Sequence, residues 1–152
     1  MSFASDIKKF AIGAGVHTDE AVRAFNTDIT RQVMQLTPVG RPELWKTKYP
    51  PKGYTGGRAK GNWFASIGAP STRVDDDIRA KDETKPLAAA MNAIQKSPGE
   101  VYYLANNLPY IRRLEYEGWS SLAPSGMVRI TMAKANRLLK AQARKANKKP
   151  KI

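Results

Sequence analysis

The stretch from Thr18 to Leu36 carries the pattern that most constrains this fold. Apolar side chains recur there at steps of three and four residues, which is the spacing of one face of an α-helix. The members of this stripe are Val22, Phe25, Ile29, Val33 and Leu36. Thr18 suits an N-cap, the acidic pair that follows it suits a helix N-terminus, and Pro38 stops the helix.

The other elements are predicted from composition and from the residues that begin or end helices and strands. Residues 61–68 show partial alternation and residues 100–106 are β-branched and aromatic, so both predict strands. Short helices are expected in the first dozen residues, at 87–96 and from Pro109 to the residue before Gly118. A last helix, 125–146, begins at Ser125 as its cap. Its apolar stripe consists of Val128, Met132, Ala135 and Leu139.

This order of elements predicts a single α+β domain over residues 1–146. We expect a small antiparallel sheet packed against two long helices, followed by a flexible basic tail at 147–152. Residues 38–61 read as an extended loop, because they contain four prolines and five glycines. Loops of this length are usually functional or disordered. The aromatics Trp45, Tyr49 and Tyr54 argue against simple disorder.

Positive charge is concentrated in the C-terminal part of the chain. The formal net charge is +13, and from Gly118 onward there are nine Lys or Arg and no acidic residue. Such an arm suits nucleic acid, an acidic protein or an anionic membrane, or it is a solvated tail. It has no interleaved aromatics and no base-reading motif, so only non-specific nucleic-acid contact is supported. The candidate contacts are Arg137, Lys140, Arg144, Lys145 and Lys148.

No pattern of catalytic or ligand-binding residues emerges, so we expect no catalytic, cofactor or metal site and no enzyme. The 152 residues include no cysteine and one histidine, His17. The run Asp75–Asp77 reads as a solvated turn rather than a cation site. The segment Gly56–Gly61 lacks the spacing of a phosphate loop and precedes a strand. Glu115 and Glu117 face different sides of a helix, where Arg112 and Arg113 can ion-pair with them at the surface or between subunits.

The sequence also lacks the signals that would direct it to or across a membrane. No apolar run approaches the length that crosses a bilayer, and the first residues lack a secretory signal. We therefore expect a chain that is made in the cytoplasm and has no membrane partner.

Two blocks of sequence resemble one family. TPVG at 37–40 followed by GGRAKGNWFASIGAP at 56–70 forms the first block, and YYLANNLPYIRRLEYEGWSSLAPSGMVRIT at 102–131 forms the second. Together they resemble the tail-completion, or neck, proteins that join head and tail in long-tailed bacteriophages. The resemblance spans roughly Asp6 to Leu139. This chain departs from the family pattern in a longer loop after Pro38 and in Trp119, where a smaller residue is common.

The resemblance implies a structural virion protein that is made in the host cytoplasm. It implies small α+β subunits that form a ring, by analogy a hexamer, between the head connector (portal) and the tail tube or tail terminator. DNA would pass through the lumen of that ring. The alternative is a non-specific nucleic-acid-binding accessory protein that uses the basic helix.

Stable interfaces favour Trp, Tyr and Arg as anchors, and this predicts which residues make subunit or partner contacts. The predicted interface residues are Trp45, Tyr49, Tyr54, Arg112, Arg113, Glu115, Glu117 and Trp119. Of the neighbours Trp63 and Phe64, at least one is expected in the core, because adjacent strand residues face opposite sides.

Overall fold

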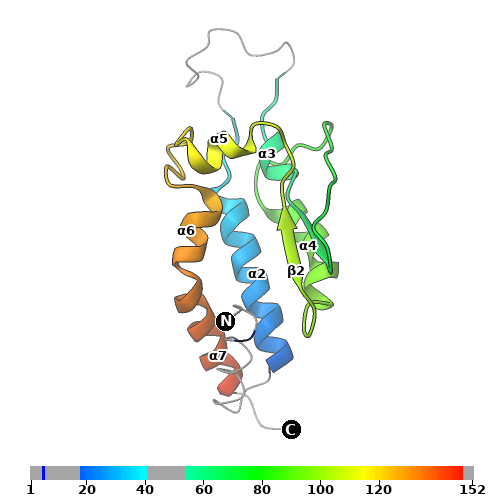
Figure 1. Cartoon of the computed structure of the whole chain (residues 1–152), viewed down its shortest axis with the longest axis vertical. Coiled ribbons are helices and arrows are strands. Elements are labelled where there is room, and N and C mark those ends of the chain that lie inside the picture. The colour runs from blue at the N-terminus through cyan, green and yellow to red at the C-terminus, as the bar shows by residue number, and fades with distance from the viewer. Residues whose placement is uncertain (1–4, 6–17, 41–53, 149–152) are drawn as a thin grey trace.

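The computed structural model describes Ser5, residues 18–40 and residues 54–148 (Figure 1). These ranges hold six helices with defined bounds and one antiparallel sheet of two strands. In chain order they are α2 (Thr18–Leu36), α3 (Arg58–Gly61), β1 (Phe64–Ile67), α4 (Thr84–Gln95), β2 (Tyr102–Ala105), α5 (Ile111–Tyr116), α6 (Met127–Ala133) and α7 (Ala135–Asn147). The predicted α+β class is confirmed at this level.

Some predicted features lie outside the described residues. The helix expected in the first dozen residues is described only at Ser5, which is helical. Trp45, Tyr49 and the end of the basic tail at 149–152 also fall outside. The described part of the predicted 38–61 loop differs from expectation at its end, where Arg58–Gly61 forms the short helix α3.

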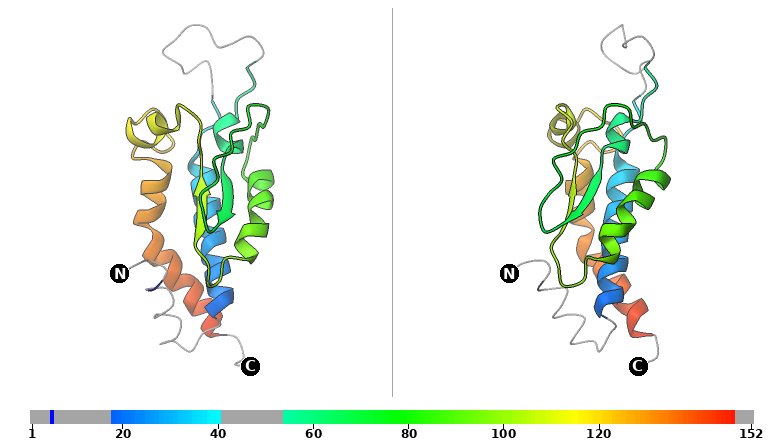
Figure 2. Two further views of the ribbon diagram at one scale, coloured as in Figure 1. Left: turned by 45° about the vertical axis from the view of Figure 1, so that its right-hand side comes forward. Right: turned by 90° about the vertical axis from the view of Figure 1, so that its right-hand side faces the viewer.

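Helix α2 is the central element, as its apolar stripe predicts. It runs along the long axis of the molecule, with α6 and α7 on one side and β2 and α4 on the other (Figures 1 and 2). Near its N-terminal end, Phe25 packs with Ala135 and Leu139 of α7. Near its C-terminal end, Val33 and Met34 enter the main core. One helix therefore contributes to both hydrophobic clusters of the described residues.

The sheet is antiparallel, as predicted, and pairs Phe64 with Ala105 and Ile67 with Tyr102. Helix α4 and the segments around it connect the two strands, and α4 packs on β1. The Tyr102 hydroxyl lies 2.6 Å from the Thr30 hydroxyl of α2, which ties the sheet to the central helix. Burial raises the pKa of Tyr102, against the smaller opposing effect of the Thr30 hydrogen bond.

Trp63 is the residue of the Trp63–Phe64 pair that enters the core. Its side chain is buried together with Met34, Ile94 and Met127. The indole N–H donates to the Thr37 hydroxyl at 2.8 Å, and that hydroxyl donates to the Val33 carbonyl at 2.7 Å. A buried indole N–H thus has a partner, which its burial requires. Phe64 is half-buried.

Asn62 organises the polar stretch that follows β1. This side chain is completely buried. Its amide oxygen accepts the Asp75 N–H at 2.8 Å, and its amide nitrogen donates to the Asp75 carbonyl at 2.9 Å and to the Arg58 carbonyl at 2.8 Å. Asn62 therefore pairs with the backbone of Asp75 as a neighbouring strand would, and this holds the distant segment in place.

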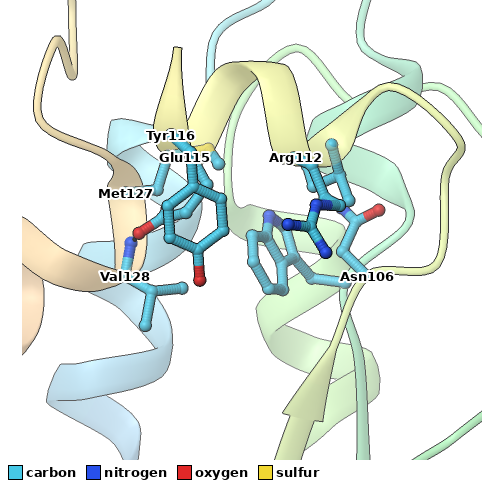
Figure 3. A pocket seen from close by; sticks show the side chains of 8 residues that line it. Asn106, Arg112, Glu115, Tyr116, Met127 and Val128 are labelled. Carbon is cyan, nitrogen blue, oxygen red and sulfur yellow. Dashed lines mark hydrogen bonds between the residues drawn. The ribbon is translucent and has the colours of Figure 1, made fainter. Parts of the chain in front are cut away.

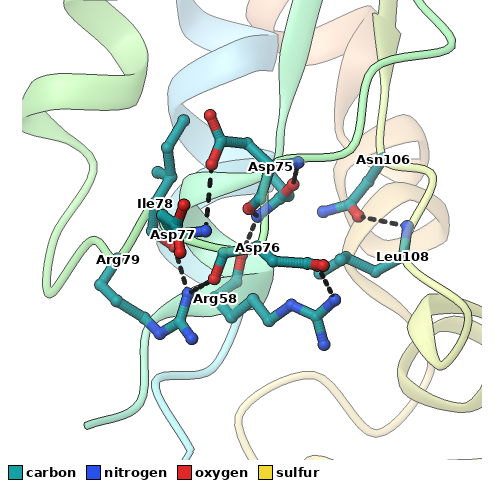
Figure 4. A network of polar contacts seen from close by, with 9 residues as sticks. Arg58, Asp75, Asp76, Asp77, Ile78, Arg79, Asn106 and Leu108 are labelled. Carbon is teal, nitrogen blue, oxygen red and sulfur yellow. Dashed lines mark hydrogen bonds and ion pairs between the residues drawn. The ribbon is translucent and has the colours of Figure 1, made fainter.

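The Asp75–Asp77 run forms the predicted turn, with Asp76 and Asp77 exposed. The Asp77 N–H donates to the Asp75 carboxylate at 3.0 Å, and Arg73 donates to its other oxygen at 3.0 Å. Both contacts lower the pKa of Asp75, and the hydrogen bond from the Asp77 N–H has the larger effect. Asp76 pairs with Arg58 of α3 (Figure 4). Two of the three carboxylates, those of Asp75 and Asp76, thus make ion pairs within the chain.

The single helix predicted at 125–146 is wrong. The chain instead forms α6 and α7, which meet at Lys134, and α6 begins after Gly126 rather than Ser125. Within the predicted apolar stripe, Ala135 and Leu139 are buried, but Val128 and Met132 are exposed. The inward positions of α6 are Met127 and Thr131. Thr131 tolerates burial because its hydroxyl donates to the Met127 carbonyl at 2.7 Å.

Replacing Asn62 tests its role in the fold. We expect Asn62→Ala to lower the free energy of unfolding by about 2–4 kcal/mol, because buried backbone groups of Asp75 lose their partners. The matched control is Asn107→Ala. Asn107 is exposed, although its amide also donates to two backbone carbonyls, at 2.8 and 3.1 Å. The control is expected to change stability by less than about 1 kcal/mol. Urea unfolding measures both, and equal losses would contradict the assigned role.

Candidate functional site

Helix α5 is held in place by the residues that precede it. Asn106 donates from its amide to the Ala59 carbonyl of α3 at 2.8 Å. Its amide oxygen accepts the Leu108 N–H at 3.3 Å, and Leu108 is buried. Ile111 and Leu114 then pack on the main core. The remaining face of α5, with Arg112, Arg113 and Tyr116, points to solvent.

Glu115 joins α5 to the start of α6. Its carboxylate is buried and accepts the backbone N–H groups of Val128 and Arg129, each at 3.0 Å. Both N–H groups belong to the first turn of α6, which otherwise has no side-chain cap. The Arg129 side chain lies 3.5 Å from the same carboxylate and also donates to the Glu115 carbonyl. A negative group at this position satisfies orphan donors and complements the helix dipole.

Gly126 allows this close approach. It has φ +96°, and a Cβ there would lie 2.5 Å from both the Glu115 carbonyl and a carboxylate oxygen. Any other residue would therefore displace the cap. The expectation that Glu115 makes a surface or intersubunit contact does not fit this position, because its carboxylate is buried and hydrogen-bonded within the chain. Glu117 does remain exposed and lies 4.0 Å from Arg113, the pairing that the sequence predicted.

An arginine–aromatic face covers the outside of α5 and α6. We define it as Arg112, Arg113, Tyr116, Trp119, Val128 and Arg129. The guanidinium of Arg129 lies 4.9 Å from the centre of the Tyr116 ring. That of Arg112 lies 5.6 Å from the same ring, and Figure 3 shows Arg112 and Tyr116. Arg113 lies 4.8 Å from the Trp119 ring. Each of these contacts is within cation–π range.

The apolar part of this face is unusually open. Tyr116 and Trp119 are each 61% exposed, and nearby Leu122 is 53% exposed. Val128 and Met132 add exposed apolar surface along α6. Exposed aromatics that cluster with arginines are typical of protein–protein interfaces. Of the six residues that define the face, the sequence predicted Arg112, Arg113 and Trp119 as contacts but not Tyr116, Val128 or Arg129.

A small cavity lies behind the arginine–aromatic face, between α5 and α6. It measures about 140 Å³ and is lined by Trp63, Asn106, Ile111, Arg112, Glu115, Tyr116, Met127 and Val128 (Figure 3). Its charged and amide side chains are those of Arg112, Glu115 and Asn106, and the rest of its wall is mainly apolar. Its volume is smaller than the roughly 300–1,000 Å³ of typical ligand pockets.

The five basic residues predicted as contacts lie on α7 or at its end. Arg137, Lys140, Arg144, Lys145 and Lys148 are all exposed. The opposite side of α7, including Ala143 and Ala146, is buried, and α7 packs along α2.

Tyr54 is the described aromatic of the long loop. It is half-buried rather than on the arginine–aromatic face, and burial raises its pKa against the opposing effect of Arg79. Burial is the main cause that raises the pKa of Tyr110, and the Tyr54 phenol adds a smaller effect in the same direction. Tyr54 thus sits close to the N-terminal end of α5.

Within the described ranges, no group of three or more metal-binding side chains occurs. None of the helices described is both long enough and apolar enough to span a bilayer. Comparison with family models, with curated proteins and with solved structures found no match to this chain.

Replacing Glu115 tests the cap on α6. We expect Glu115→Ala to lower the free energy of unfolding by about 1–3 kcal/mol, because two N–H groups lose their acceptor and Arg129 loses its partner. Glu115→Gln retains one acceptor oxygen and should fall between Ala and wild type. The control, Glu117→Ala, removes an exposed ion pair and should cost no more than about 0.5 kcal/mol. Chemical denaturation at neutral pH measures all three, and an equal cost for Glu115→Ala and Glu117→Ala would refute the capping role.

Proposed function

We propose that this chain is a structural virion subunit of a bacteriophage head–tail joint, with no catalytic role. It would form a ring, by family analogy a hexamer, between the portal-side connector and the tail tube or tail terminator. The observation that carries the proposal is the arginine–aromatic face. The resemblance of residues 37–40, 56–70 and 102–131 to the tail-completion family gives that face its biological setting.

The composition of the face supports an interface. Trp, Tyr and Arg dominate the binding energy of protein–protein contacts, because large rigid rings bury much area at small entropic cost. Here two exposed rings are each in contact with at least one guanidinium. The arginines hold the rings in defined positions before any partner arrives, which lowers the entropy lost on binding.

The support beneath the face fits a role in assembly. Glu115 locks α5 to α6 through two backbone hydrogen bonds, and Gly126 permits the close contact. Both residues belong to the second block of the family resemblance. Trp63, from the first block, shares the core with Met127 directly behind the face. The two blocks thus make one structural unit under the proposed interface, which supports reading them as a single motif.

A ring requires each subunit to offer surface to its neighbours. The arginine–aromatic face would supply one such surface, to a second copy of this chain or to the connector or tail protein next to it. Its rim is polar and charged, with Glu117 and Arg113 paired at 4.0 Å. A polar rim around exposed aromatics is the usual anatomy of an interface.

Truncating the exposed rings tests this proposal. In the virus that encodes the chain, we expect Trp119→Ala or Tyr116→Ala to reduce incorporation into particles by about 30-fold, which corresponds to about 2 kcal/mol for an interface anchor. Quantitative mass spectrometry of purified particles, scored against the portal protein, measures the ratio. Each isolated variant should stay folded, since both rings are 61% exposed.

The control is Val101→Ala. Val101 is 58% exposed but precedes β2, away from the arginine–aromatic face. It should be incorporated normally. Absence of the wild-type chain from intact particles would overturn the virion role. Presence of the wild type with normal incorporation of both ring variants would instead show that another surface mediates assembly.

A further inference from the structure

The cations of α7 form an organised surface that the proposed assembly role does not use. Arg137, Lys140, Arg144 and Lys148 follow one another at steps of three and four residues. This spacing places them on one side of a helix, over about 16 Å of its length. All four are exposed. We refer to these four residues as the basic stripe.

The basic stripe is separate from the apolar side of α7. Leu139 packs with Phe25 of α2, and Ala143 and Ala146 are also buried. Gln142 on this inner side donates to the Asp28 carboxylate of α2. Helix α7 is thus anchored by its inner side, and its cations project from a fixed support rather than from a loose tail.

The charge of the basic stripe is not neutralised within the described part of the chain. None of the ion pairs found there involves any of its four side chains. The arginines of the arginine–aromatic face differ, because they contact rings or carboxylates. No acidic residue follows Glu117 in the sequence, so α6 and α7 carry positive charge only. Like charges at this spacing repel, which disfavours the isolated helix and favours an external polyanion.

The side chains on and around the basic stripe indicate which kind of polyanion it would bind. An amphipathic helix that lies within a membrane surface inserts an apolar face into the bilayer, and the apolar side of α7 is instead packed against α2. Binding to single-stranded nucleic acid uses aromatic side chains on which bases stack, and α7 contains none. A row of cations with neither feature fits a regularly spaced line of phosphates. Duplex nucleic acid presents about one phosphate per 3.4 Å along each strand.

We propose that the basic stripe of α7 binds the phosphate backbone of duplex nucleic acid without reading its sequence. Arg137, Lys140, Arg144 and Lys148 supply the phosphate contacts, and α2 holds the helix against the rest of the subunit. This inference stands on α7 alone and does not require the chain to form a ring.

Salt-dependent binding to a labelled DNA duplex of about 30 base pairs tests the proposal with the full chain. Four phosphate contacts predict a slope of about −3.6 for log K against log salt, and hence a loss on the order of 100-fold between 50 and 200 mM NaCl. The triple variant Lys140→Gln, Arg144→Gln, Lys148→Gln should flatten the slope by about 2.7. Duplexes of unrelated sequence should bind equally, and the corresponding single strand more weakly.

The matched control is Lys81→Gln, Lys85→Gln, Lys96→Gln, which removes the same charge from exposed positions on or beside α4. It should keep the wild-type slope. Circular dichroism confirms that both triple variants retain their helices.

Four results would overturn the proposal. They are no duplex binding at 50 mM NaCl, an unchanged slope in the α7 variant, an equal loss in the α4 control, or tighter binding to the single strand. Displacement of the duplex by poly-glutamate as readily as by unlabelled duplex, at equal charge, would instead identify an acidic protein as the partner.

Discussion

The buried carboxylate of Glu115 is the contact on which the junction of α5 and α6 depends. It accepts hydrogen bonds from two backbone N–H groups of α6, and the Arg129 side chain forms an ion pair with it. A helix N-terminus needs such acceptors, and here the acceptor comes from a different helix. The cap therefore fixes the angle between α5 and α6. Tyr116, next in sequence to Glu115, and Val128 and Arg129, whose N–H groups it binds, are positioned by the same contact.

Buried hydrogen bonds between distant segments also stabilise the part of the fold around β1 and α2. Asn62 bonds both backbone groups of Asp75, and Trp63 bonds Thr37 at the end of α2. Each contact joins segments that are far apart in sequence through a buried polar group. Buried polar groups of this kind are costly unless they are satisfied, so they allow few alternative arrangements. The sheet itself has only two strands, and such sheets need packing against helices for stability.

The molecule separates two kinds of positive surface. At one end, on α5 and the start of α6, arginines are engaged with rings and carboxylates beside exposed apolar side chains (Figure 1). At the other end, α7 carries cations in the absence of both aromatics and acids. The first arrangement suits a protein partner with its own apolar surface. The second suits a partner that offers charge alone. The two proposed contacts therefore use opposite ends of the molecule.

The sequence by itself determined the elements that have a strong local signal. The stripe from Val22 to Leu36 specified α2, and the β-branched and aromatic run before Asn106 specified β2. It also determined that the cations of α7 lie away from its buried side, because their spacing follows the helix period.

Only the tertiary structure decided which side of α6 faces inward and what Glu115 does. Met127 and Val128 are adjacent apolar residues, and helix periodicity accepts either as the inward one. Met127 is the inward one, because it packs with Trp63 and with Val33 and Met34 of α2. Together with Thr131, Ala135 and Leu139 it forms a buried side that continues at steps of four residues across the turn at Lys134. The acceptor role of Glu115 depends on N–H groups 13 and 14 residues away. No local sequence pattern encodes a contact between two helices. Glu115 was therefore predicted at the surface, whereas its buried carboxylate connects α5 to α6.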